Sequence, residues 1–400
     1  MVNLALLIAF ICLLPRYLWA GKSLTLLKRK LLPPAVDTQG KPVIWLHAVS
    51  LGEMKAGQPL YQHLQKMHSD AFFLITTSTQ TGFEEAHRSY ARASAILYLP
   101  FDFSWIIHPF VYNLKPKQFI AIEGDLWPNL LTALKSVGAH TMLVSGKLSR
   151  RSARRLKWIA WVARKWFSAF DVLCMQSEDH AQRIAAFVAE PSRIKVTGNL
   201  KYDANPVPID LDHWKERFRI DLPIISLIST HAPEEAQLLP LLLSHRVVVF
   251  LIPRHPERFQ EVKRLLERMH VTYALWSSGV YQGQSIILVD AMGQVPICAA
   301  LSSLAIVGGS FVPGIGGHNV FEPCLYGAPT VFGPHTTAQT QLVSSLERAG
   351  AGRGVTLETL PLFLNRFLTH PEERSRYRNG ACQVVREMRG ALERTIAAIQ

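Results

Sequence analysis

The segment GSFVPGIGGHNVFEPCLYGAPTVFGPH, from Gly309 to His335, places glycines, a histidine and an asparagine just ahead of Phe321-Glu322-Pro323. It follows an apolar run, Leu304 to Val307, that predicts a buried parallel strand. Glycines between a strand and a helix leave backbone N–H groups open at the helix N-terminus, where a phosphate binds well. We therefore expect a nucleotide with few phosphates here, with Glu322 one turn into the helix and near its ribose. The alternative is an ordinary glycine-rich turn.

Acidic and basic side chains follow other predicted strands of the first half. Glu53 opens a helix after the run VIWLHAVS, where it is either a capping carboxylate or a general base that takes the proton of an alcohol nucleophile. Glu123 and Asp125 end the run FIAIEGD before a Trp-Pro pair, a position that also suits helix capping. Lys201 follows a Gly-Asn turn, where it could meet a substrate anion.

The second half contains a similar set. Arg254 and His255 end the apolar run VVVFLIPR, and an arginine at a strand tip can hold a phosphate with paired hydrogen bonds. The loop Asp290–Gln294 could enclose a base or a ribose, and Ser229 to His231 could cap a helix or line the same site. The patterns HExxH, Walker A, GxSxG and DxD do not occur. A donor with one phosphate needs less countercharge than a diphosphate, so we expect no metal and no cofactor.

Short β-rich runs alternate with helical patterns from Pro42 onward, which indicates parallel, doubly wound sheets. The predicted strands of the first half lie in Val43–Ser50, Phe72–Thr79, Ala95–Pro100, Phe119–Asp125, Thr141–Gly146, Val172–Ser177 and Ile194–Asn199. After a Pro- and Asp-rich linker, Ala204–Asp212, the alternation restarts with Ile224–Thr230, Val247–Arg254, Ser285–Asp290, Leu304–Ser310 and Thr330–Gly333. We predict an α/β protein with two Rossmann-like domains and a ligand in the cleft between them. The domains are expected at residues 31–205 and 206–400, after an N-terminal segment, residues 1–30.

Charge is unevenly distributed along the 400 residues. Residues 1–200 hold 24 Lys and Arg against 12 Asp and Glu, whereas residues 201–400 hold 19 against 18. The first half is therefore expected to meet an anionic partner, such as a membrane surface, a nucleic acid or an acidic substrate. The five cysteines form no CxxC pair, which suits a reducing compartment.

The N-terminal segment favours the membrane among these partners. Leu4 to Leu14 is an unbroken apolar run, shorter than the roughly 20 residues of a secure span. No positive charge precedes it, and basic residues follow, so we expect an interfacial (monotopic) or short single-pass anchor that leaves the rest of the chain in the cytoplasm. The alternative is a first helix packed on its domain.

The stretch Arg150–Phe167 holds seven basic residues, three tryptophans and no acid. We read it as one helix that suits either the headgroup zone of an anionic membrane or a phosphorylated glycolipid. A half-buried helix with a solvated basic face is the alternative. Because the basic excess comes with an apolar anchor and tryptophans, nucleic acid is the poorer partner.

Taken in order, VSLGE, EGDLWPN, GNLKYD, STH, PRHPERF, DAMG and GGHNVFEPCLYGAPTVFGPH resemble the 3-deoxy-D-manno-octulosonic acid (Kdo) transferases of bacterial lipopolysaccharide assembly. The resemblance covers nearly the whole chain. It implies a GT-B fold and an inverting transfer of Kdo from CMP-Kdo to a lipid A precursor (lipid IVA), at the cytoplasmic face of the inner membrane. The family usually has ETELWPN, MGE and Asn-Ala-Arg where this chain has Glu123-Gly124-Asp125, a final Gln294 and Ser145-Gly146-Lys147.

The resemblance also implies roles for individual residues. Glu53 resembles the base that activates the acceptor hydroxyl, and Glu123 and Lys201 resemble the pair that stabilises the transition state. The segments similar to those that hold CMP contain Arg254, His255, Met292, Gly293, Gln294, Asn319, Val320, Phe321 and Glu322. Other hypotheses are another GT-B enzyme with a lipid acceptor, such as a hexosamine transferase, and a non-catalytic receptor for CMP-sugars or anionic lipid.

Overall fold

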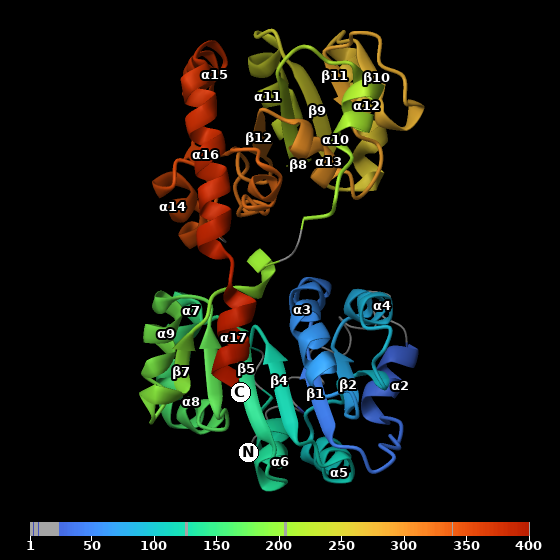
Figure 1. Ribbon diagram of the computed structural model, residues 1–400, viewed down its shortest axis with the longest axis vertical. Coiled ribbons are helices and arrows are strands. Elements are labelled where there is room, and N and C mark those ends of the chain that lie inside the picture. The colour runs from blue at the N-terminus through green and yellow to red at the C-terminus, as the bar shows by residue number, and fades with distance from the viewer. Residues whose placement is uncertain are drawn as a thin grey trace. The chain divides into compact units, whose positions relative to one another are not determined.

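The computed structural model describes Asn3, Leu7 and residues 24–124, 127–203, 206–337 and 339–399. Most of the expected N-terminal anchor, and also Asp125, lie outside these residues. The chain divides into two compact units (Figure 1). The first comprises Met1–Ala204 with Met388–Gln400, and the second comprises Asn205–Glu387.

The first unit is built on a parallel sheet in the order β3-β2-β1-β4-β5-β6-β7. Its strands are β1 (Val43–His47), β2 (Phe72–Thr77), β3 (Ala95–Tyr98), β4 (Gln118–Ile122), β5 (His140–Gly146), β6 (Val172–Met175) and β7 (Ile194–Val196). Its helices are α2 (Leu24–Leu31), α3 (Leu51–Met67), α4 (Gln80–Ser89), α5 (Ser104–Leu114), α6 (Pro128–Ser136), α7 (Arg150–Trp158), α8 (Ala160–Phe167), α9 (Glu178–Ala185) and α17 (Ala391–Ile399), with the 3₁₀ turns η1 (Pro191–Arg193) and η2 (Leu200–Asp203).

The central strands of this sheet are buried on both faces, as their continuous apolar runs predict. Trp45 of β1 packs in one core with residues of α5 and α6, whereas the neighbouring Leu46 packs in a second core with residues of α3 and α4. Successive side chains of a strand point to opposite faces, so one apolar strand supplies both cores. The sheet therefore leaves only its two ends for polar side chains.

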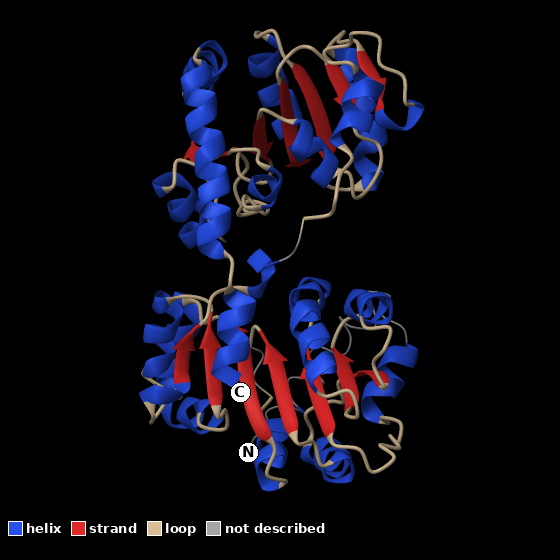
Figure 2. Cartoon of the chain, viewed as in Figure 1, coloured by secondary structure: helices blue, strands red, loops and turns tan. Residues whose placement is uncertain are grey.

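The second unit repeats this plan with the order β10-β11-β9-β8-β12-β13-β14, again parallel (Figure 2). Its strands are β8 (Ile224–Thr230), β9 (Val248–Pro253), β10 (Tyr273–Leu275), β11 (Ile286–Leu288), β12 (Leu304–Val307), β13 (Thr330–Phe332) and β14 (Gly352–Gly354). Its helices are α10 (Leu211–Phe218), α11 (Glu234–Leu243), α12 (Phe259–Arg268), α13 (Val295–Leu301), α14 (Thr340–Arg348), α15 (Leu360–Thr369) and α16 (Pro371–Met388), with the 3₁₀ turns η3 (Pro256–Arg258), η4 (Trp276–Ser278) and η5 (Glu322–Tyr326).

Each predicted strand is present, and the two parallel α/β sheets are confirmed. Several details differ. The short edge strands β10 and β14 were not predicted, since Gly352–Gly354 carries no apolar run. The helix expected at Arg150–Phe167 is interrupted at Ile159, whose ψ of 37° departs from helical geometry, so that α7 and α8 are separate. The helix expected at Glu322 is the single 3₁₀ turn η5.

The predicted second domain, residues 206–400, extends too far, because α17 belongs to the first unit. Ala391 at its start is fully buried in the first unit's core. The carboxylate of Asp203 accepts hydrogen bonds from the backbone N–H groups of Gly390, at 2.6 Å, and of Leu392. The first turn of α17 is thus capped by a residue almost 190 positions earlier, which periodicity along the chain does not reveal.

We expect Asp203→Ala to loosen α17 selectively, because it removes the acceptor for the N–H groups of Gly390, just before the helix, and of Leu392, in its first turn. Loss of a helix cap costs about 0.5–2 kcal/mol of stability. Hydrogen exchange of residues 391–399 should accelerate while that of the second unit is unchanged. As a control, Asp212→Ala replaces an exposed acid in the first turn of α10 and should leave α17 as protected as in the wild type.

Candidate active site

Each sheet has one point where the strand order reverses, and loops that leave the two strands flanking it diverge into a crevice that commonly binds ligands. In the first unit β1 and β4 flank this point, and in the second unit β8 and β12 flank it. Glu53 follows β1 and Glu123 follows β4, while His231 follows β8 and His318 lies in the loop after β12. The residues with candidate chemistry therefore gather at the reversal point of each sheet.

Glu123 is the centre of the first unit's site. Its side chain is only 3% exposed. Its two oxygens form ion pairs with different lysines, Oε1 with Lys201 and Oε2 with Lys147. Both lysine side chains are about half exposed. The two lysines come from the ends of other elements, Lys147 just after β5 and Lys201 from η2. The structure thus joins Glu123 and Lys201, which the family resemblance implies act together, although 78 positions separate them.

The backbone at Glu123 is arranged for this contact. Glu123 has a φ of 66°, in the left-handed region that non-glycine residues seldom adopt, and Gly124 follows with a φ of 117°. Burial would raise the pKa of the Glu123 carboxyl, but the ammonium groups of Lys201 and Lys147 outweigh burial and hold that pKa below its usual range. The cluster is therefore a buried anion that presents two half-exposed cations to solvent.

Glu53 lies at the start of α3. Its Oε2 accepts a hydrogen bond of 2.7 Å from the backbone N–H of Val49, so the capping interaction expected of this position is present. The side chain is half-buried. A Cβ built on the adjacent Gly52 would lie 3.9 Å from Cε of Lys201, which brings the start of α3 next to the lysine of the Glu123 cluster. Its role as a base stays a prediction.

Lys147 was not predicted as a site residue. In the sequence it is visible only as part of Ser145-Gly146-Lys147, which stands where the family usually has Asn-Ala-Arg. The available signal was its position: Lys147 directly follows β5, which neighbours β4 in the sheet. Two adjacent parallel strands end at the same edge, so residues just past their ends meet.

We expect Glu123→Gln to lower the free energy of unfolding by about 1–3 kcal/mol at neutral pH, since it leaves two lysines without their buried partner. The folded-state pKa of Glu123 is depressed, so its contribution is present above the unfolded-state pKa and is lost as pH falls through the folded-state value. The stability difference between wild type and variant should therefore shrink below pH ~4. A difference that stays constant from pH 7 to pH 3 in denaturant titrations would contradict this electrostatic account.

The residues predicted to bind a nucleotide all follow strands of the second sheet, β11 and β9 on one side of β8, and β12 on the other. Arg254 and His255 follow β9, Met292 to Gln294 follow β11, and Asn319 to Glu322 follow β12. Arg254, Met292 and Asn319 are exposed. The sequence therefore placed these segments at one edge of one sheet, and their contact with a nucleotide stays a prediction.

Two of these residues face the core. Val320 is 0% exposed and Phe321 is 1% exposed, and their backbone N–H groups donate to the side chains of Gln339 and Asn319. Their side chains shape the loop from within. Only the flanking Asn319 and Glu322 offer polar side chains here.

Four backbone N–H groups of the glycine turn, those of Gly309, Phe311, Gly317 and His318, are used within the protein. Both oxygens of the fully buried Glu234 serve the loop that follows β12: Oε2 accepts from Gly309 at 2.8 Å, and Oε1 accepts from Phe311 at 3.0 Å. Gly317 and His318 donate to the carbonyls of Gly309 and Gly308. These internal hydrogen bonds hold the turn, and the side chains beside it are further groups that could meet an anion. Binding of a phosphate at this turn stays a prediction.

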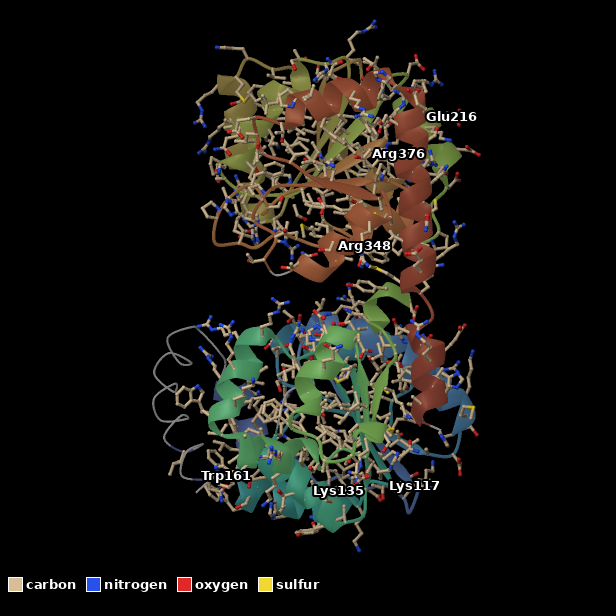
Figure 3. All side chains as sticks on the ribbon, turned by 90° about the vertical axis from the view of Figure 1, so that its left-hand side faces the viewer. Lys117, Lys135, Trp161, Glu216, Arg348 and Arg376 are labelled. Carbon is tan, nitrogen blue, oxygen red and sulfur yellow. The ribbon has the colours of Figure 1, made fainter. Side chains whose placement is uncertain are left out.

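The surface of α7 and α8 exposes two of the tryptophans of the basic stretch Arg150–Phe167. Trp158 is 90% exposed and Trp161 is 69% exposed, and Trp161 is labelled on the first unit in Figure 3. Ile159, at the break between the two helices, is also exposed. The helix α7 that ends at Trp158 also carries four arginines and a lysine. Two exposed indoles amid basic groups form a surface of mixed apolar and cationic character.

In the part of the chain that the structure describes, no helix is long and apolar enough to cross a membrane. Among the same residues, His, Cys, Asp and Glu side chains do not gather in threes around a point where a metal ion could be held.

The fold identifies a class first. The chain is similar to UDP-GlcNAc 2-epimerase from Neisseria meningitidis bound to UDP-GlcNAc, with a TM-score of 0.61 and 14% identity over 89% of this chain and 99% of that one. It is similar to a glycosyltransferase from Rickettsia africae, with a TM-score of 0.58 and 14% identity over 90% of this chain and 98% of that one. At such identity these likenesses show the fold alone, that of GT-B-like proteins with two parallel α/β domains.

Sequence comparison then gives the family. Residues 25–204 match the model of the 3-deoxy-D-manno-octulosonic-acid transferase (kdotransferase) family. The chain is 33% identical to the 3-deoxy-D-manno-octulosonic acid transferase of Chlamydophila psittaci, over 90% of this chain and 85% of that protein. It is 31% identical to the Haemophilus influenzae protein of the same name, over 88% and 85%. The chain belongs to the 3-deoxy-D-manno-octulosonic acid transferase family, and the predicted resemblance is confirmed.

Proposed function

We propose that this protein transfers Kdo from CMP-Kdo to a lipid A precursor, lipid IVA, with inversion at the anomeric carbon. The observation that carries the proposal is the cluster of Glu123 with Lys201 and Lys147. Two residues expected to act together from the sequence are in contact at the reversal point of the first sheet. Family membership supports the type of reaction, and the acceptor is the part that the experiment below must test.

The reaction displaces CMP from the anomeric carbon of Kdo by a hydroxyl of the acceptor. Glu53 takes the hydroxyl proton as the new C–O bond forms, because an alcohol becomes nucleophilic enough only as its proton leaves. Positive charge develops at the sugar carbon in an oxocarbenium-like transition state. The Glu123 carboxylate, kept ionised by its lysines, offers charge that opposes it, and the lysines remain available for anionic groups of the substrates.

The leaving phosphate gains negative charge as its bond to the sugar breaks. Arg254 and the polar groups after β9, β11 and β12 are the proposed contacts of CMP: His255, the loop Met292–Gln294, and the segment Asn319–Glu322 with Glu322 near the ribose. Arginine suits the phosphate because its planar group donates paired hydrogen bonds. The donor has a single phosphate, so we propose that the transfer needs no metal ion.

The assay that tests this proposal combines the full-length protein with CMP-Kdo and a tetra-acylated lipid A precursor, followed by mass spectrometry. We expect acceptor masses raised by one or more Kdo increments. Chelation of divalent metals should leave the rate unchanged. An acceptor mass that never changes, although CMP binds, would favour a receptor over an enzyme.

Glu53→Gln separates the base from the cap. The glutamine oxygen can still accept the Val49 N–H, so the fold should persist with at most about 1 kcal/mol lost from the helix dipole. Turnover should fall by roughly 10²–10⁴-fold, the usual share of general base catalysis, with CMP affinity near that of the wild type. Full turnover in a folded Glu53→Gln protein would remove Glu53 from the mechanism and direct attention to Glu123.

We also propose that α7 and α8 contact the cytoplasmic face of the inner membrane. Trp158 and Trp161 are exposed among basic residues, and this combination suits the headgroup region of an anionic bilayer. The apolar stretch near the N-terminus, outside the described residues, is proposed as a second attachment.

Replacing Trp158 and Trp161 together with Ala should weaken binding to vesicles that contain anionic lipid, as measured by co-sedimentation. High salt should weaken the remaining binding further, because it screens the basic groups. The matched control replaces the exposed Trp105 of α5, which lies on another helix. If Trp105→Ala and the double variant reduce binding equally, α7 and α8 are not the contact surface.

A further inference from the structure

The second unit contains a pair of histidines that the proposed mechanism does not use. Nε2 of His231 lies 2.7 Å from Nε2 of His318, within hydrogen-bonding distance. Their ring centroids are 4.9 Å apart and their planes differ by 10°. Because the two nitrogens are much closer than the centroids, the rings meet edge to edge, in nearly the same plane, through this hydrogen bond.

The pair bridges the reversal point of the second sheet. His231 directly follows β8, and His318 lies in the loop after β12, so one imidazole comes from each side of the crevice. Both rings are half-buried. His255 at the end of β9 is also close, with its ring centroid 5.5 Å from that of His231. Ligands of parallel α/β sheets bind at this position.

Hydrogen bonds hold the backbone segments that carry the two histidines, and several of them go to the buried carboxyl group of Glu234. Glu234 accepts from the backbone N–H of His231 at 2.9 Å and from the N–H of Gly309 at 2.8 Å. The backbone N–H of His318 in turn donates to the carbonyl of Gly308. A Cβ added at Gly309 would lie 2.9 Å from the imidazole of His318, so only glycine leaves room for the ring there. The position of the rings is thus determined by the fold around them.

A hydrogen bond between two Nε2 atoms holds a single proton. One ring donates, the other accepts, and the accepting neutral ring must carry its own proton on Nδ1. The donating ring has an Nδ1 lone pair, and among the described residues neither Nδ1 has a hydrogen-bond partner. Protonation of that Nδ1 would give the two histidines together a positive charge and an N–H donor at each end.

The surroundings keep this second proton away in the free protein. Burial and the nearby His231, Arg254 and His255 lower the pKa of His318 to about 4, and burial also lowers the pKa of His231. The charged and titratable groups that face the pair are Glu234, Glu235, Arg254, His255 and Arg258. Of these, Glu235 is already paired with Arg258 at 2.6 Å, and Glu234 is occupied by backbone N–H groups. An added anion would reverse the balance.

We propose that His231 and His318 form a proton-coupled binding site for the phosphate of a cytidine nucleotide. The N–H groups of Gly309, Phe311, Gly317 and His318 are engaged within the turn, so side chains beside it are suited to complete an anion site. The pair lies in the crevice and can gain a proton and a charge when a phosphate approaches. This inference rests on the proposed function for the identity of the nucleotide, whereas the anion site itself does not depend on it.

The sign of the pH dependence follows from linkage. A bound anion raises the pKa of the pair, so its contribution to affinity is present at low pH and is lost as pH rises through the pKa of the complex. Between the pKa of the free pair and that of the complex, uptake of one proton means that affinity falls about tenfold for each unit of rising pH. Sulfate is a useful probe, because it is a tetrahedral dianion that does not itself titrate in this range.

The experiment measures binding of CMP and of sulfate by calorimetry between pH 5.5 and 8, in buffers of different ionisation enthalpy. The wild type should take up close to one proton per anion at the acid end. His318→Gln keeps a hydrogen-bonding group near His231 but cannot hold the proton, so it should lose most of this uptake and bind CMP roughly 10- to 100-fold more weakly at pH 6. His231→Gln should behave alike. The matched control His213→Gln, an exposed histidine of α10 in the same unit, should resemble the wild type.

The two probes, CMP and sulfate, distinguish failure of the anion site from failure of the proposed donor. If the wild type, His213→Gln and both pair variants bind CMP with the same affinity and the same proton uptake, the anion site is wrong and the proposed donor stands. If sulfate binds with proton uptake that His318→Gln abolishes while CMP does not bind, the anion site stands and the proposed donor is wrong. Comparing wild type with variant at each pH also cancels the titration of the CMP phosphate.

Discussion

A carboxyl group buried in a protein needs donors around it, because removing it from water is costly unless hydrogen bonds or charges replace the lost solvation. Each unit meets this constraint at the reversal point of its sheet, Glu123 in the first and Glu234 in the second. Glu123 is 3% exposed and Glu234 is not exposed at all. Donors from separate segments of the chain must converge on each of them. These two side chains therefore tie together the loops that carry the remaining polar groups.

The two carboxyl groups satisfy the same need by different means. Glu123 gathers side-chain cations, Lys147 and Lys201, whose exposed ends stay in contact with solvent. Glu234 gathers backbone N–H groups from the loops after β8 and β12. Backbone donors carry no net charge, so the second site is a rigid frame for its neighbours, whereas the first is itself a cluster of charges. The first cluster is thus suited to electrostatics and the second to positioning.

The sequence predicts what depends on local patterns. Continuous apolar runs located all of the central strands, and because parallel strands end at one edge, the polar residues after them could be assigned to that edge. The short strand Gly352–Gly354 has no such run and is formed by pairing with β13 alone. The capping of α17 by Asp203 and the contact between His231 and His318 depend on segments 187 and 87 positions apart. No periodicity of the chain encodes such contacts.

The glycine segment shows why a motif predicts a place better than a mechanism. Gly309 was correctly expected to allow a tight turn, and its φ of 67° agrees with that role. Its N–H group, however, is taken by Glu234, a residue 75 positions earlier that no local pattern connects with it. What the glycine then contributes is space, since a Cβ at this position would collide with His318. Gly309 thus makes room for the imidazole that we propose meets the phosphate.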